Sequence, residues 1–367
     1  MGSVVETGET EADTFDGIVG NAAVLRRLGQ SLEAGVSHAY LFYGPGGVGK
    51  RTVARRFGSA LVAGGDAKAE ERARRGLHPD LVEVEPEGAF TTIGQVRNLV
   101  RQAASRPFEG ERRVFILEAD TLNVQAANAL LKTLEEPEGR AVFVLLAASR
   151  EGVMPTISSR AQSIRFNPVP AAEVAEFLRK RGVTEPDLAA SLGRGSVGLS
   201  LRYAGEKELR ELREAVFEAA FSYDADFELR HQAASVILER AESVGAAKEA
   251  AYLERFDEPD RRAKDGAKRA GRGARDGAFL EALDLISLVY RDAAMLSVGA
   301  EDLLANVDRV EEIRRRVHSH PDADWAGAAL KVGESKAGLT YNVALEAILE
   351  VALSQIRQRV LQHSPGS

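Results

Sequence analysis

The chain has 367 residues, of which 44% are hydrophobic and 28% are charged, a composition typical of a folded protein with two or three domains. It contains no cysteine, which excludes disulfides and thiolate metal sites, and its six histidines show no metal-binding spacing, so we expect no bound metal. The net charge of −7 disfavours a protein that grips nucleic acid through an overall basic surface. No apolar run is long enough to cross a membrane and no export signal is visible, which predicts a cytoplasmic protein without a membrane partner.

The first predicted segment, residues 1–14, is polar and acidic and is expected to be a disordered tail. Beyond it, short apolar runs typical of buried strands alternate with stretches whose apolar residues have helical spacing. The expected strands are 39–43, 80–86, 114–119, 141–148 and 163–166, and the expected helices between them include 24–32, 93–105 and 123–136. This alternation predicts an α/β fold with a doubly wound, mostly parallel sheet.

The strand signals stop after Pro170. Residues 171–182 and 187–204 are expected to form a small helical module, and the rest of the chain has the pattern of one helix after another. A stretch rich in charge and glycine, residues 257–277, interrupts this pattern and is expected to be a solvated, flexible insert. The sequence therefore predicts a C-terminal part without strands.

A glycine-rich loop, LFYGPGGVGKRT at 41–52, follows the first predicted strand and opens a helix. Glycines allow backbone N–H groups to wrap around a phosphate at the positive end of the helix dipole, and a lysine adds a charge. The residues that fit this role are Gly44, Gly46, Gly47, Gly49 and Lys50. The next position, where a magnesium-binding hydroxyl is needed, holds Arg51, and the hydroxyl of Thr52 comes one place too late.

The end of the strand at 114–119 is also incomplete for nucleotide hydrolysis. Glu118 stands where a metal-binding acid is expected, but Ala119 has no polar atom to orient the attacking water. Because two requirements fail together, we expect no catalysis by this chain's own site, while ATP binding without hydrolysis stays open. Arg160 follows the strand at 141–148 and has the type of side chain that stabilises transition-state charge in a neighbouring subunit, or that simply caps a surface helix.

Several segments, in this order, resemble the AAA+ subunits of bacterial DNA polymerase III clamp loaders. They are FDGIVGN (15–21), the glycine loop, GLHPDL (76–81), AANALLKTLEEP (126–137), TISSRAQ (156–162) and GSVGLSL (195–201). The resemblance implies an AAA+ P-loop core at 15–168, a small helical lid at 169–204 and an all-α collar at 205–362. It also implies gamma/tau and delta subunits as partners in a heteropentamer, with the sliding clamp and primer–template DNA met through the complex.

Departures from the family pattern favour its non-hydrolysing delta-prime branch over its ATP-burning gamma/tau branch. Besides Arg51 and Ala119, Gly198 stands where the family's sensor arginine would fall, whereas Arg160 keeps the position of the arginine that acts on a neighbour's nucleotide. The resemblance thus implies a stator that needs no cofactor of its own within a DNA-directed DNA polymerase holoenzyme. A gamma/tau-like subunit that binds or hydrolyses ATP remains the alternative, and Ala119 disfavours a stand-alone AAA+ enzyme.

Two further features concern metals and DNA. Family members usually carry four cysteines that bind zinc between the glycine loop and the HPD segment. The interval 58–80 has none, so no zinc module is expected and a helical or apolar segment is expected in its place. Arg97 and Arg101 lie four residues apart on one face of a predicted helix, where they either contact DNA phosphates or form a solvated face.

Overall fold

The computed structural model describes residues 14–86, 90–136, 139–341 and 343–361. Contacts divide the chain into two compact units. The first contains the residues up to Gly182 together with Gly195–Leu199, and the second contains Val183–Arg194 and the residues from Ser200 onward. The predicted tail at 1–14 lies, except for its last residue, outside the described residues.

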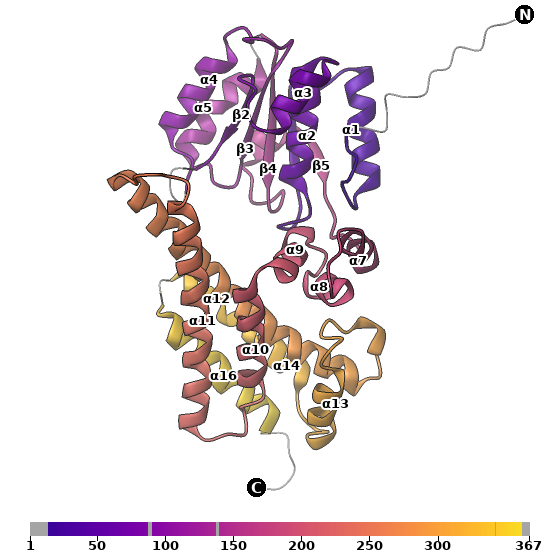
Figure 1. The fold of residues 1–367 in the computed structure, drawn as a ribbon, viewed down its shortest axis with the longest axis vertical. Helices are drawn as coiled ribbons and strands as arrows, with labels where there is room; N and C mark the ends of the chain where they lie inside the picture. The colour runs from indigo at the N-terminus through magenta and orange to yellow at the C-terminus, as the bar shows by residue number, and fades with distance from the viewer. Residues whose placement is uncertain (1–13, 87–89, 137–138, 342, 362–367) are drawn as a thin grey trace, which may run out of the picture. The chain divides into compact units, whose positions relative to one another are not determined.

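A five-stranded parallel sheet forms the centre of the first unit (Figure 1). Its strands are β1 (Ala39–Tyr43), β2 (Leu81–Val84), β3 (Arg113–Glu118), β4 (Ala141–Ala147) and β5 (Gln162–Arg165). Their order across the sheet is β2-β3-β4-β1-β5. This order brings the carboxyl ends of β1 and β3 to the same edge of the sheet, with β4 between them, and it confirms the predicted α/β class.

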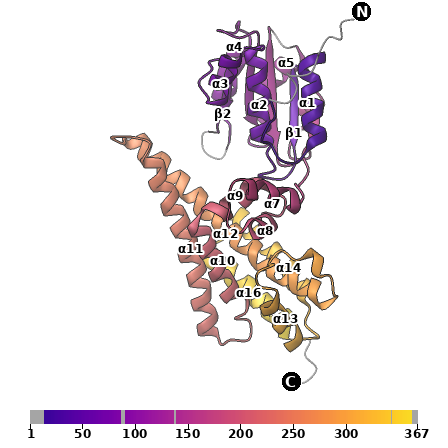
Figure 2. The ribbon, with the colours of Figure 1, turned by 45° about the vertical axis from the view of Figure 1, so that its right-hand side comes forward.

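Helices cover both faces of this sheet (Figures 1 and 2). One layer consists of α1 (Ala22–Ala34), α2 (Lys50–Ala63) and α3 (Ala67–Arg74), and the other of α4 (Ile93–Ala103), α5 (Val124–Glu135) and α6 (Pro155–Ser158). Alternate strand residues serve the two layers, because Tyr40 and Phe42 belong to the core beneath α2 whereas Leu41 belongs to the core beneath α5. Burial on both faces accounts for the continuous apolar runs of the strands. Helix α7 (Ala171–Lys180) follows β5.

A short helix, α3, occupies the interval in which no zinc module was expected. Asp66 caps this helix by accepting a hydrogen bond from the Lys68 amide at 2.9 Å, and α3 packs against α2. Farther along the interval, Asp80 is fully buried and accepts hydrogen bonds from the backbone N–H groups of residues 108–110 at 2.8 to 3.0 Å. The prediction of a helical segment here is confirmed.

The second unit is helical over its described residues. Its elements are α8 (Pro186–Leu192), the end of α9 (Val197–Gly205), α10 (Lys207–Ala220), α11 (Phe227–Leu253), α12 (Arg261–Ser297), the 3-10 turn η1 (Glu301–Leu303), α13 (Val310–Ser319), α14 (Trp325–Ser335), α15 (Ala337–Thr340) and α16 (Leu345–Leu361). Helix α12 is central, because it packs against α10, α11, α13 and α14 and buries Phe279, Leu283 and Ile286 completely. The predicted all-α C-terminal part is confirmed.

The prediction of a flexible insert at 257–277 is wrong for most of that stretch. Residues from Arg261 onward form the first turns of α12, and the Asp260 carboxylate caps them by accepting a hydrogen bond from the Ala263 amide at 2.7 Å. Glycine lowers helix propensity in isolation. Here it allows close packing, since a Cβ on Gly245 of α11 would lie only 2.9 Å from the carbonyl oxygen of Gly271. Tertiary packing therefore stabilises a helix that composition alone disfavours.

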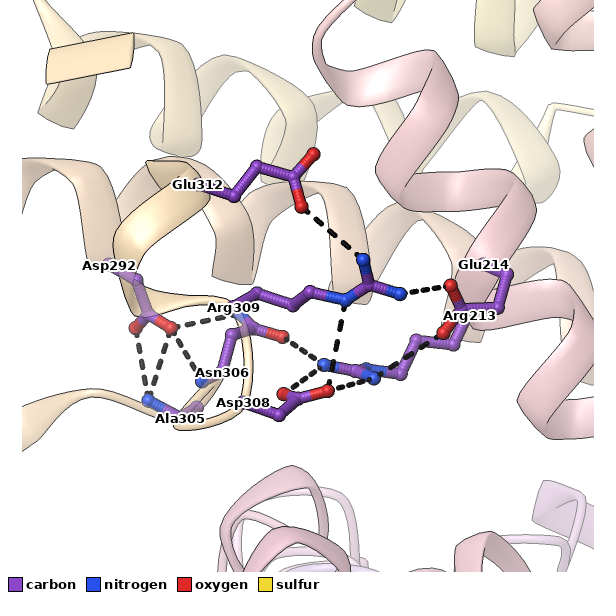
Figure 3. Close-up of polar contacts among 8 residues, drawn as sticks. All are labelled: Arg213, Glu214, Asp292, Ala305, Asn306, Asp308, Arg309 and Glu312. Atoms are coloured by element: carbon purple, nitrogen blue, oxygen red, sulfur yellow. Dashed lines mark hydrogen bonds and ion pairs between the residues drawn. The ribbon is translucent and has the colours of Figure 1, made fainter. Parts of the chain in front are cut away.

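A buried polar network fixes the chain between η1 and α13 onto α10 and α12 (Figure 3). Asp292 of α12 is fully buried and accepts hydrogen bonds from the backbone N–H groups of Ala305 and Asn306. Arg213 of α10, whose side chain is 5% exposed, donates to Asp308 at 2.7 and 3.0 Å and to Asn306 at 3.2 Å. Burying a charged group is costly unless the group is paired. These hydrogen bonds and ion pairs explain how Arg213 and Asp292 can be buried.

Candidate functional site

The glycine loop between β1 and α2 has the backbone shape of a phosphate cradle. Gly44, Gly47 and Gly49 have φ values of +148°, +71° and +98°, which glycine adopts without strain. A Cβ on Gly44 would lie 2.2 Å from the carbonyl oxygen of Phe166, so a side chain is excluded there. Gly49 is the N-cap of α2, which places the loop at the positive end of that helix.

Lys50 bonds to the loop itself. Its Nζ donates to the carbonyl oxygens of Gly44 at 2.5 Å and Pro45 at 2.6 Å. Burial lowers the pKa of Lys50, and the charges of Glu118 and Asp120 oppose this without reversing it. The lysine that would meet a phosphate therefore caps the two carbonyls that begin the loop.

Arg51 places its guanidinium group beside the acid that ends β3. Its Nη2 donates to Oε1 of Glu118 at 2.8 Å, and its Nη1 lies 3.8 Å from Glu83 and 3.9 Å from Glu85. Burial acts to lower the pKa of Arg51, but the hydrogen bond and charge of Glu118, with the charges of Glu83 and Glu85, raise it overall. A guanidinium has no acceptor atom for a cation. The arrangement therefore does not fit a magnesium ion, because Arg51 supplies no oxygen and neutralises the carboxylate that would face the ion. Thr52 is exposed in the next position.

The residue after β3 has no acidic side chain, but the next residue along the chain, Asp120, has one. Ala119 is buried and uses its backbone N–H to bond the carbonyl oxygen of Leu146 at 2.7 Å. Asp120 follows it, is exposed, and accepts a hydrogen bond from the Ala148 amide at 2.8 Å. Sequence reasoning missed Asp120 and Glu83, although Asp120 adjoins the strand end and a search one position further finds it. Neither residue restores a polar side chain at position 119.

The segment that begins with Gly195 braces the outside of the glycine loop. The backbone N–H of Gly198 donates to the carbonyl oxygen of Gly47 at 3.0 Å. A Cβ on Gly47 would lie 1.9 Å from Oγ of Ser196 and would displace that hydroxyl, and the positive φ value of Gly47 separately favours glycine. At Gly198, where the resemblance places a lost arginine, the chain thus makes a backbone contact with the loop.

Arg160 lies apart from the glycine loop, just after α6. Its Nη1 donates to the carbonyl oxygen of Thr156 at 2.8 Å and to Oγ of Ser159 at 3.3 Å, and its Nη2 forms an ion pair with Glu135 at the end of α5. The Arg160 side chain remains 33% exposed. The structure therefore holds this guanidinium in one orientation at the surface.

Arg97 and Arg101 project from the exposed side of α4, opposite the buried Val96 and Leu99. Thr92 begins the helix with a capping box, and Arg101 donates to Oδ1 of Asn98 at 3.3 Å. The two arginines share one helix face as predicted, and a DNA contact through them stays a prediction.

Several known proteins are similar to this chain. A DNA polymerase III subunit delta' from Pseudomonas aeruginosa is 38% identical over 198 residues, which are 50% of this chain and 60% of that protein. The subunit of the same name from Bacillus subtilis is 26% identical over 338 residues, 89% of this chain and 93% of that protein. Residues 20–170 match the family described as DNA polymerase III, delta subunit. Together these matches support a delta-prime subunit of DNA polymerase III.

The delta-prime match includes the glycine loop, Arg51, Glu118 and Arg160. A gamma/tau subunit from Mycobacterium tuberculosis is 32% identical over 190 residues, 47% of this chain and 33% of that protein. The family predicted from the sequence motifs is therefore confirmed. No helix in the described part of the chain is both long and apolar enough to span a membrane.

Proposed function

We propose that this delta-prime-family chain is a non-hydrolysing subunit of a DNA polymerase III clamp loader. It would assemble with gamma/tau and delta subunits in a heteropentamer in the cytoplasm, and would lend Arg160 to the ATP site of a neighbouring gamma/tau-type subunit while the sliding clamp is loaded onto primer–template DNA. The observation that carries the proposal is the 2.8 Å contact between Arg51 and Glu118, which puts a fixed cation where an ATPase needs a metal ion.

Loss of hydrolysis follows from the chemistry of the site. Phosphoryl transfer depends on positioning and on stabilising negative charge, for which ATPases of this type use a metal-binding hydroxyl, an acid and a water-orienting group. Arg51 removes the hydroxyl and neutralises Glu118, and Ala119 removes the water-orienting group. We also propose that the chain requires no nucleotide, since Lys50 bonds to the loop's own carbonyls.

The surroundings of Arg160 suit a group that acts on another subunit. The carbonyl of Thr156 and the carboxylate of Glu135 orient the guanidinium while leaving it partly exposed. The Arg160–Glu135 pair is exposed on both sides, at 33% and 47%, so exchanging Glu135 for a phosphate costs at most about 1 kcal/mol. An arginine delivered in trans is worth about 10³ to 10⁵ in the rate of phosphoryl transfer.

The first test uses the purified chain alone. We expect no magnesium-dependent release of phosphate from ATP, and no binding of a fluorescent ATP analogue that depends on magnesium. A purified gamma/tau subunit serves as the positive control in the same assay. Steady magnesium-dependent turnover by the chain itself would remove the basis of the proposal.

The second test uses the reconstituted loader and single-turnover phosphate release. Arg160→Ala should abolish the fast phase contributed by one nucleotide site and leave the other phases unchanged. Arg160→Lys keeps the charge but loses the two-pronged donor geometry, so it should restore little of that phase. Lys132→Ala removes an exposed cation of α5 and is the matched control. Wild-type kinetics with Arg160→Ala would refute the role of this arginine.

A further inference from the structure

Helix α12 exposes a cationic face near its N-terminus. Its first turns carry six exposed cationic side chains, which are Arg261, Arg262, Lys264, Lys268, Arg269 and Arg272. Among the described residues these side chains make no ion pair or hydrogen bond. They stay unpaired although Asp265 lies four residues from both Arg261 and Arg269, the spacing at which helix ion pairs form. One turn farther on, Arg275 does pair, with Glu242 at 3.2 Å.

Helical geometry arranges part of this face as a row. Lys264, Lys268 and Arg272 follow one another at intervals of four residues, which places them one above the other. The row spans eight residues, a length of about 12 Å at 1.5 Å per residue. The opposite side of the same turns consists of small residues such as Ala263 and Ala267, which are buried against α11.

The cationic row lies where the paired helices α11 and α12 project from the rest of the second unit. The paired ends of α11 and α12 project beyond α10, α14 and α16 in both views (Figures 1 and 2). Close contact between Gly245 and Gly271 joins α11 and α12, and the Asp260 carboxylate caps the first turn of α12. The connection between the helices is acidic, with Glu254, Asp257 and Glu258 exposed, which confines the positive surface to the flank of α12.

We propose that this flank of α12 binds the phosphate backbone of nucleic acid without reading its sequence. Each strand of duplex DNA presents one negative charge per about 3.4 Å of the helix axis, so a row of about 12 Å spans about three or four phosphates of one strand, enough to pair its three cations whatever the base sequence. An acidic polypeptide would instead need carboxylates at one matching spacing. The surface is distinct from Arg97 and Arg101, and it depends neither on nucleotide nor on Arg160.

The test measures the salt dependence of DNA binding by the full chain alone. Fluorescence anisotropy with a labelled duplex of arbitrary sequence would compare wild type with the triple variant Lys264→Gln, Lys268→Gln and Arg272→Gln. Glutamine is a good helix former, so α12 should persist, which circular dichroism checks. The matched control changes Arg26, Arg27 and Lys68, three exposed cations of the first unit, to glutamine, with the same loss of net charge.

Each released counterion contributes about 0.9 to the slope of log affinity against log salt. The triple variant should therefore lose about 2 to 3 units of slope and at least tenfold in affinity at about 0.1 M salt, while the control variant keeps the wild-type slope. Equal slopes for the two variants would overturn the proposal, as would the absence of DNA binding by the wild-type chain at low salt. Polyglutamate and unlabelled DNA would be compared as competitors at equal concentrations of negative charge. If polyglutamate displaced the labelled duplex as effectively as unlabelled DNA, the surface would be assigned to acidic protein segments instead.

Discussion

Replacing Arg51 with serine should convert the carboxylate cluster beside the glycine loop into a weak magnesium site. In the wild type the guanidinium lies 2.8 Å from Glu118 and within 3.9 Å of Glu83 and Glu85. Its removal leaves three carboxylates without this cation and places a hydroxyl where ATPases bind their metal ion. Both partners of the Arg51–Glu118 pair are partly exposed, at 39% and 28%, so we expect the substitution to lower the free energy of unfolding by about 1 kcal/mol without magnesium.

Magnesium should then stabilise the variant more than the wild type. If the new site has a dissociation constant of about 1 mM, magnesium at about 10 mM adds about 1.4 kcal/mol to the free energy of unfolding. For a unit of about 150 to 250 residues this corresponds to a rise in melting temperature of about 3 to 6 °C. The wild type should show no such rise, because Arg51 already neutralises Glu118.

Scanning calorimetry at several magnesium concentrations measures this effect. Trp325, the single tryptophan of the chain, lies in the second unit, so its fluorescence follows a transition that magnesium should leave in place. Arg55→Ser is the matched control, because Arg55 bonds Glu83 at 2.5 Å and its loss leaves Glu118 paired. Arg51→Lys keeps a cation and should remain insensitive to magnesium. The same magnesium shift in the wild type and in all three variants would refute the idea that Arg51 stands in for a metal ion.

Two other substitutions test the packing of the first unit. Gly47→Ala should lower the free energy of unfolding in urea by about 2 kcal/mol, because φ is +71° and the new Cβ would lie 1.9 Å from Oγ of Ser196. Gly46→Ala is the control: its Cβ would meet no atom within 4 Å, so the free energy of unfolding should change by less than about 0.5 kcal/mol. Equal effects of the two substitutions would contradict this reasoning. Asp80→Asn should cost about 2 kcal/mol at neutral pH, because an amide group would face a backbone donor. Burial acts to raise the pKa of Asp80, but three backbone N–H donors and the charge of Arg113 lower it overall. The stability that the Asp80 carboxylate contributes is therefore complete above the unfolded-state pKa, and it is lost as the pH falls through the lower folded-state pKa. The difference between wild type and Asp80→Asn should therefore shrink below about pH 4, and a constant difference would show that Asp80 contributes no pH-dependent stability.

Local patterns predict the elements of the first unit well but not their partners. The apolar runs and the glycine loop indicate strands, a phosphate cradle and the missing hydroxyl at Arg51 without reference to the rest of the chain. The contact between Arg51 and Glu118 joins residues 67 positions apart and depends on the order of the strands, which no local pattern specifies. The sequence therefore shows that a hydroxyl is missing at Arg51 and a polar side chain is missing at Ala119. The fold adds that Arg51 compensates the charge of Glu118.

The first turns of α12 are rich in charge and glycine, as the sequence shows, but they do not form the flexible insert that this composition predicts. The charge and glycine content of residues 257–277 favours a loop, but the spacing of the small residues in the same stretch indicates a helix. Alanine and glycine recur with helical spacing at Ala263, Gly266, Ala267, Ala270 and Gly271. That spacing makes a smooth side for α11 to pack against, and it necessarily places the lysines and arginines on the opposite side at fixed intervals. A flexible loop would present the same charges without a defined spacing, so the helix, and not the charge content, is what makes this surface a specific candidate for binding a regularly spaced polyanion.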